Sequence, residues 1–123
     1  MRILHPALLL SWCLLIFWLS SRPVIPTPLL FEHQDKLFHA ASYAVMGWLF
    51  WRWGQAAPAW PASRTVALGL LFCSLYGASD EWHQSFVPAR DASTGDWLAD
   101  TLGAVLMFAV LHWRAVAAVR ARG

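Results

Sequence analysis

The chain has 123 residues, of which 59% are apolar and 13% charged, and its formal net charge is +2. Soluble domains carry about 25% charged residues, so this composition excludes an ordinary water-soluble domain and favours one domain in a lipid bilayer. The mean hydropathy of +0.47 agrees with this interpretation. Membrane lipids are therefore the expected surroundings, and no tract of basic residues indicates a nucleic-acid partner.

Four apolar runs predict an all-α fold, a bundle of four transmembrane helices within a single domain. The expected helices cover residues 3–20, 37–53, 65–81 and 96–113 of the domain 1–123. The first run could be a signal peptide, but no A-x-A-like site follows it, so we expect a retained helix. Prolines break the chain between the runs, in an extended loop at 22–30 (Pro23, Pro26 and Pro28), at Pro58 and Pro61, and at Pro88.

The placement of basic residues predicts the orientation of the bundle. With a cytoplasmic amino terminus, six basic residues lie inside and three outside, namely Arg22, Lys36 and Arg90. The excess of positive charge inside favours two cytoplasmic termini. All seven acidic residues then fall on the outer half, whose formal charge is 3 − 7 = −4.

Polar residues recur at helical spacing where three of the expected helices reach the outer face. They form the stripes Asp35, His39 and Tyr43, then Tyr76, Asp80 and Gln84, with Glu81 and His83 beside the second stripe, and finally Asp96 and Asp100. A carboxylate at membrane depth costs several kcal/mol unless it is paired, hydrated or protonated. We therefore predict the functional site at these helix ends.

Helix electrostatics explains part of this pattern. Asp96 and, less well, Asp100 complement the positive amino end of their helix. Asp80 and Glu81 lie at a carboxyl end, where the helix dipole disfavours anions, so cations such as Lys36 and Arg90 should compensate them. Arg90 either binds a carboxylate as a fork or stays free for an anionic substrate group.

Two uses are open for His39 and His83. Either histidine could exchange protons with a neighbouring carboxylate at neutral pH. Alternatively, the pair could bind a divalent metal together with Asp80, Glu81 or Asp100. Because no motif with metal-ligand spacing is present, no metal site is predicted, and the residues do not identify a cofactor. Cys13 and Cys73 lie in apolar runs and are expected to be inert.

Small residues occur at near four-residue spacing in the second and fourth helices. They are Ala40, Ala44 and Gly47 in one helix and Gly95, Ala99 and Gly103 in the other. Such spacing lets helix backbones approach closely. Close packing here would bring His39 next to Asp100.

These residues resemble the VanZ-like membrane proteins over about residues 35–107. The family pattern reads roughly D-K-x-x-H-x-x-x-Y, D-E-x-x-Q, R and D-x-x-x-N-x-x-G, and the matches are Asp35-Lys36, His39, Tyr43, Asp80-Glu81, Gln84, Arg90, Asp96 and Gly103. Asp100 departs from the pattern, which more often has Asn there. The resemblance implies a multi-pass protein of the bacterial inner (plasma) membrane, in a family named after a member linked to teicoplanin resistance.

Three functions remain open, and the sequence does not settle whether the protein is an enzyme. The leading hypothesis is an outer-face site acting on a cell-envelope lipid, a polyprenyl-linked intermediate or a peptidoglycan precursor. Its expected catalytic residues are His39, Asp80, Glu81 and Asp100, and its expected substrate-binding residues are Lys36, Tyr43, Gln84, Arg90, Asp35 and Asp96. The alternatives are a non-catalytic envelope interaction protein and a proton-linked carrier, which would need to form a homo-oligomer to build a translocation path.

Overall fold

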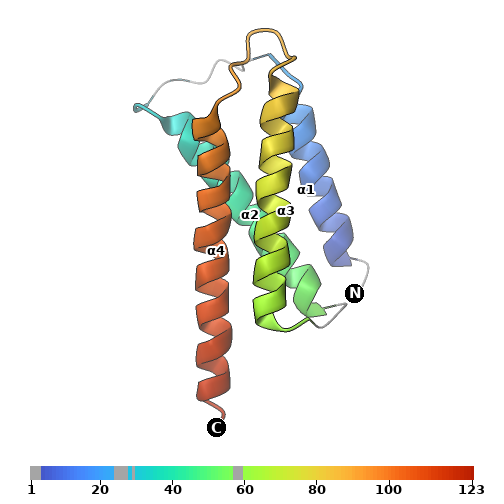
Figure 1. Ribbon diagram of the computed structural model, residues 1–123, viewed down its shortest axis with the longest axis vertical. Coiled ribbons are helices and arrows are strands. Elements are labelled where there is room, and N and C mark those ends of the chain that lie inside the picture. Colours follow the sequence, from blue (N-terminus) through green and yellow to red (C-terminus); the bar gives the residue numbers. More distant parts are fainter. Residues whose placement is uncertain (1–3, 24–27, 29, 57–59) are drawn as a thin grey trace.

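The computed structural model describes residues 4–23, 28, 30–56 and 60–123. Within these ranges the chain forms four helices and no strand, which confirms the all-α prediction (Figure 1). The helices are α1 (Leu4–Ser20), α2 (Gln34–Ala56), α3 (Ala62–Gln84) and α4 (Thr94–Arg120). Consecutive helices run in opposite directions, so α1 and α3 end where α2 and α4 begin. We call this end, the upper one in Figure 1, the polar end.

The helices start and stop close to the breaks that the sequence predicts, although three of them are longer than expected. Helices α2 and α3 have 23 residues each, and α4 continues to Arg120 instead of ending near residue 113. Pro61 directly precedes α3, and Pro88 lies in the loop between α3 and α4. Pro26 and Pro58 lie outside the described residues.

Length and hydropathy single out one membrane-span candidate among the described helices, α4, with a mean hydropathy of 1.8 over its most apolar window. Helix α1 is apolar but has only 17 residues. Helices α2 and α3 are long enough, but their polar-end turns carry several charged residues. The arrangement with four membrane spans therefore stays a prediction.

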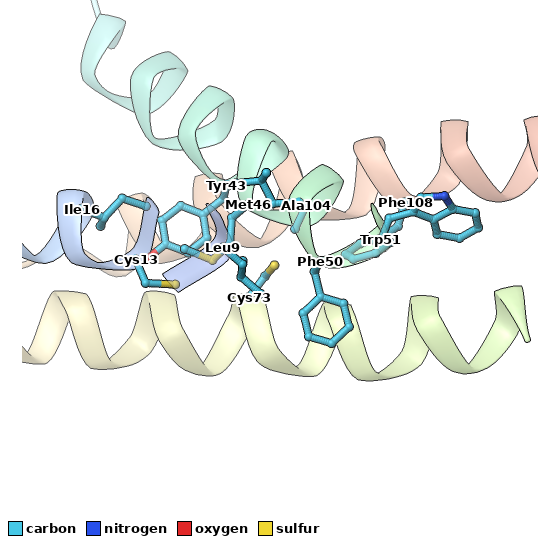
Figure 2. Packing of buried hydrophobic residues seen from close by; sticks show 11 residues of the cluster. Leu9, Cys13, Ile16, Tyr43, Met46, Phe50, Trp51, Cys73, Ala104 and Phe108 are labelled. Carbon is cyan, nitrogen blue, oxygen red and sulfur yellow. The ribbon is translucent and has the colours of Figure 1, made fainter. Parts of the chain in front are cut away.

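Apolar side chains from all the described helices meet in the middle of the bundle (Figure 2). Tyr43 and Met46 of α2 are almost completely buried there, as is Phe108 of α4. Cys13 and Cys73 belong to the same core and are free thiols. The ring of Phe108 packs directly against Gly69 of α3. Any larger residue at position 69 would overlap this ring.

The polar and apolar residues are distributed in the opposite way to those of a water-soluble protein. Large apolar side chains such as Leu10, Leu71 and Leu106 are exposed on the outside of the bundle. In contrast, six acidic or amide side chains near the polar end are buried, namely Gln34, Asp80, Glu81, Gln84, Asp96 and Asp100. In soluble proteins, acidic residues are almost never fully buried without a partner, and extensive apolar patches mark contact surfaces.

Helices α2 and α4 approach each other to backbone contact, as the small residues predict. A Cβ atom on Gly103 would overlap the backbone carbonyl group of Ala40. Two turns further along α2, a Cβ on Gly47 would lie 3.2 Å from the Phe108 ring and 3.7 Å from the Cα of Ala104. The missing side chains therefore set the spacing of these two helices.

We expect Gly103→Ala to destabilise the protein, because the new methyl group meets backbone atoms that cannot move aside by rotating a side chain. Overpacking of this kind typically costs about 1–3 kcal/mol. Thermal unfolding of the purified protein in detergent should show a lower midpoint. The control is Ala109→Leu, which adds a larger group on the exposed side of the same helix. Equal midpoints for Gly103→Ala and the unsubstituted chain would contradict the contact.

Candidate functional site

The polar end is held together by the turn that joins α3 to α4. Ser93 caps α4, because its side-chain oxygen accepts a hydrogen bond from the Gly95 amide at 3.1 Å. The backbone amide of Ser93 donates to Glu81 Oε2 at 2.8 Å. The carboxyl end of α3 is thus fixed against the amino end of α4, and the acidic residues of both helices are brought to one place.

A hydrogen bond of 2.9 Å joins His39 Nδ1 on α2 to Asp100 Oδ1 on α4. The Asp100 side chain is completely buried, and the His39 side chain is 20% exposed. Asp100 lies beside Gly77 of α3, where a Cβ atom would be 3.1 Å from Oδ2. With Asp100 ionised, the imidazole donates from Nδ1, and this fixes the ring and leaves Nε2 for other chemistry.

A second link between α2 and α4 is the ion pair of Lys36 Nζ with Asp96 Oδ1, at 2.8 Å. The Asp96 side chain is 11% exposed and that of Lys36 is 37% exposed, so the carboxylate is the more buried partner of this ion pair. Asp35 is 3.6 Å from the same ammonium group but is 60% exposed. The helix places Asp35 on the outer rim, and only His39 and Tyr43 of its stripe continue inward.

The third polar group of the site lies on α3. Gln84 Nε2 donates to Asp80 Oδ2 at 3.0 Å, which is the i, i+4 contact that the sequence spacing predicts, and it lies 3.5 Å from Ser20 Oγ of α1. Tyr43 OH is buried and has no hydrogen-bond partner among the described residues. A buried hydroxyl without a partner costs about 1–3 kcal/mol, so a bound molecule or water that reached it would recover part of this cost.

These side chains line a pocket of about 180 Å³ at the polar end, between α1, α2 and α3. We call it the polar pocket. Its lining consists of Ile16, Leu19, Ser20, Phe38, His39, Ser42, Tyr43, Asp80, Gln84 and Arg90. One wall is apolar, and the other carries an imidazole, a carboxylate, an amide and a guanidinium group.

Arg90 binds α1 in a way that the sequence did not indicate. Its Nε donates to the backbone carbonyl of Arg22, and its Nη2 donates to that of Leu19, each at 2.9 Å. Within the described part of the chain, it makes no ion pair with a carboxylate, so the expected fork onto an acid is not formed. The guanidinium closes the carboxyl end of α1 and lines the edge of the polar pocket.

His83 also faces α1. Its Nε2 lies 3.0 Å from Ser21 Oγ, and its ring is 4.6 Å from that of Phe17. The pairing of His39 with His83 that would have made a two-histidine metal site is therefore absent from the contacts of the described residues. Another set comes together instead, since His39, Glu81 and Asp96 each place one potential ligand atom within 4.8 Å of the others.

The structure brings most of the predicted site residues together and adds several that the sequence reasoning missed. Lys36, His39, Tyr43, Asp80, Glu81, Gln84, Asp96 and Asp100 gather around the polar end, with Arg90 at its edge and Asp35 outside. The missed residues are Ser20 and Ser42 in the pocket lining, Gly77 beside Asp100, and Ser93 in the turn. Ser20 could have been predicted, because four helices that run in alternating directions place the end of the first helix at the polar end.

Comparison with known families identifies the family of the chain. The model of the family described as VanZ/LLP1 matches residues 7–115. The chain belongs to the VanZ/LLP1 family. The match includes residues 7–20 of α1, which lie outside the range of about 35–107 that carries the resemblance. Proteins of the VanZ family are membrane proteins, and the apolar helix α4 agrees with this. No curated protein and no solved structure matches the chain.

We expect Asp100→Asn and Asp100→Leu to differ in stability. The amide keeps an acceptor for His39 Nδ1 and removes a buried charge, so the unfolding free energy should change by less than about 1 kcal/mol. Leucine leaves the half-buried imidazole without its acceptor and should cost about 1–3 kcal/mol. Thermal unfolding in detergent measures both variants. Similar losses in the two would mean that the hydrogen bond does not stabilise the bundle.

Proposed function

We propose that this VanZ/LLP1 family protein is a multi-pass protein of the bacterial inner membrane whose polar end faces outward and acts on a cell-envelope lipid or peptidoglycan precursor. The observation that carries the proposal is the polar pocket, where an imidazole held by a buried carboxylate meets a second carboxylate beside an apolar wall. We propose further that this activity underlies a link to glycopeptide resistance, with teicoplanin as the test compound.

The lining of the polar pocket suits an amphiphilic substrate. The apolar wall offers a surface for a lipid chain or a polyprenyl segment and consists of Ile16, Leu19 and Phe38. Leu19 and Phe38 are also exposed on the outside of the bundle. The polar wall, with Arg90 at its edge, suits a phosphate or carboxylate head group. A lipid-linked precursor combines both features in one molecule.

The chemistry available in the pocket is general acid–base catalysis. Asp100 orients His39, whose other nitrogen then exchanges a proton with the substrate. Asp80 is within the same lining and is the second acid or base. A non-catalytic binding protein would use the same pocket but would not need a titrating histidine, so the two functions differ in their sensitivity to substitution.

Helix length supports the proposed membrane arrangement. At 1.5 Å per residue, the 23-residue helices α2 and α3 are each about 34 Å long, which suffices for a hydrocarbon core of about 30 Å. Their charged turns would then lie at the outer interface, while the exposed leucines of the bundle face lipid. The buried carboxylates would face one another across the bundle interior instead of facing lipid.

We expect His39→Ala and Asp80→Asn each to abolish the effect of the protein on teicoplanin susceptibility while leaving its membrane abundance unchanged. Loss of a general acid or base lowers rates by about 10²–10⁴-fold, which is enough to remove the phenotype. The measurement is the inhibitory concentration of teicoplanin in a bacterial host that expresses each variant, together with immunoblots of the membranes.

Arg90→Ala tests the head-group contact in the same assay, and Glu32→Gln serves as the control because Glu32 is exposed. Unchanged susceptibility for all three pocket variants at equal abundance would contradict a pocket that causes resistance. If the unsubstituted chain itself leaves susceptibility unchanged, the proposed link to glycopeptide resistance is wrong.

Orientation is tested by single cysteines at exposed positions. We expect Asp91→Cys, in the turn before α4, to react with a membrane-impermeant maleimide in intact spheroplasts, and Ala121→Cys to react only after permeabilisation. Cys13 and Cys73 are buried and should contribute little background. Labelling of Ala121→Cys in intact cells would reverse or refute the proposed topology.

A further inference from the structure

The buried acids of the polar end carry more negative charge than the neighbouring basic side chains balance. Asp80, Glu81, Asp96 and Asp100 are all buried, each with at most 8% of the whole residue exposed. Among the described residues, the lysine and arginine side chains form one ion pair with this group, Lys36 with Asp96. Four carboxylates and one ammonium group leave three formal negative charges in a largely desolvated site, and such charges must be balanced by other cations or by protons.

Part of this group has the geometry of a metal site. His39 of α2, Glu81 of α3 and Asp96 of α4 each place one potential ligand atom within 4.8 Å of the other two. Ligands that bind one ion at about 2.0–2.2 Å lie at most about 4.4 Å apart. Small side-chain rotations would therefore suffice to bring three donors from three helices around a single ion.

One carboxylate oxygen at this place also has no partner among the described residues and is available as a ligand. Glu81 Oε2 accepts a hydrogen bond from the Ser93 amide, but Oε1 is buried and has no partner within the described part of the chain. Asp96 uses Oδ1 for Lys36 and has further lone pairs available. An orphaned carboxylate oxygen that is buried next to an imidazole is costly unless it binds a cation or a proton.

We propose that His39, Glu81 and Asp96 bind a divalent transition-metal ion. Asp100 binds His39 Nδ1, as a carboxylate often does for a metal-bound histidine, and this leaves Nε2 as the nitrogen for the ion. One imidazole and two carboxylates suit Mn²⁺, Fe²⁺ or Zn²⁺ and disfavour ions that need soft sulfur ligands. Three protein ligands leave open positions for water or for an oxygen atom of a bound head group.

The metal site does not depend on the proposed function, because ion binding requires only these residues and no substrate. It changes one role within that function. A histidine that binds an ion through Nε2 no longer exchanges protons there, so the acid–base role in the polar pocket falls to Asp80, which lies outside the three-ligand set.

The experiment is a Mn²⁺ titration of the full-length chain, purified in detergent and first treated with a chelator. Free Mn²⁺ is followed by its electron paramagnetic resonance signal, and Zn²⁺ is added as a competitor. We expect one Mn²⁺ per chain, displaced by Zn²⁺, and a nitrogen coupling in the electron spin echo of the bound ion. That coupling shows that a histidine nitrogen binds the ion, and its detection does not depend on any variant folding correctly.

Three variants and a matched control complete the test. Glu81→Gln and Asp96→Asn should each weaken Mn²⁺ binding at least about tenfold. Even the loss of a group that only hydrogen-bonds a metal ligand weakens metal binding by about 10–100-fold. His39→Phe should remove the nitrogen coupling. Glu32→Gln should bind as the unsubstituted chain does, because it changes an exposed glutamate at the same end of the bundle. Thermal unfolding identifies any variant that loses its fold.

Several results would overturn the metal site: binding weaker than about 1 mM, bound Mn²⁺ without a nitrogen coupling, or equal affinity in the folded Glu81→Gln variant. In each of these cases, the buried charge is balanced by protons or the ion is adventitious. Failure of the teicoplanin assay with intact metal binding would refute the proposed function alone. A teicoplanin assay that gives the expected result, together with absent metal binding, would refute the metal site alone.

Discussion

The backbone contact between α2 and α4 is the constraint on which the polar end depends. Gly103 lies against the carbonyl group of Ala40, so the two helices are close enough for His39 to reach Asp100 and for Lys36 to reach Asp96. Gly77 makes the corresponding space on α3, where the carboxylate of Asp100 enters. Glycine inside a helix costs up to about 1 kcal/mol, and here that cost is offset by contacts that a larger residue would prevent.

The buried carboxylates determine what this arrangement can do. Apolar residues at these positions would stabilise the fold as well as the acids do, because replacing buried ion pairs with apolar side chains is often neutral or stabilising. Tyr76 and Trp97 already tie the helices together through hydrogen bonds to backbone carbonyls, to Cys13 at 2.6 Å and to Ser74 at 3.0 Å. The acids are therefore more naturally explained by chemistry at the polar end than by stability.

The sequence predicted those parts of the site that depend on helical periodicity. The spacing of Asp80 and Gln84 on one helix, and the small residues that bring His39 to Asp100, depend on local geometry and were recognisable without a structure. The directions of Arg90 and His83 were not, because both side chains bind α1, whose position follows from tertiary packing. The position of Asp35 on the outer rim has the same origin, since a stripe on a helix does not reveal which of its turns another helix covers.

His39 is the residue at which the possible functions compete. Asp100 occupies one ring nitrogen, so a single nitrogen remains for either a proton or a metal ion. An ion bound to it would place positive charge beside Glu81 and Asp96 and would leave Asp80 as the acid–base group of the polar pocket. Occupancy of this one nitrogen would thus distinguish the proposed acid–base role of His39 from its proposed role as a metal ligand.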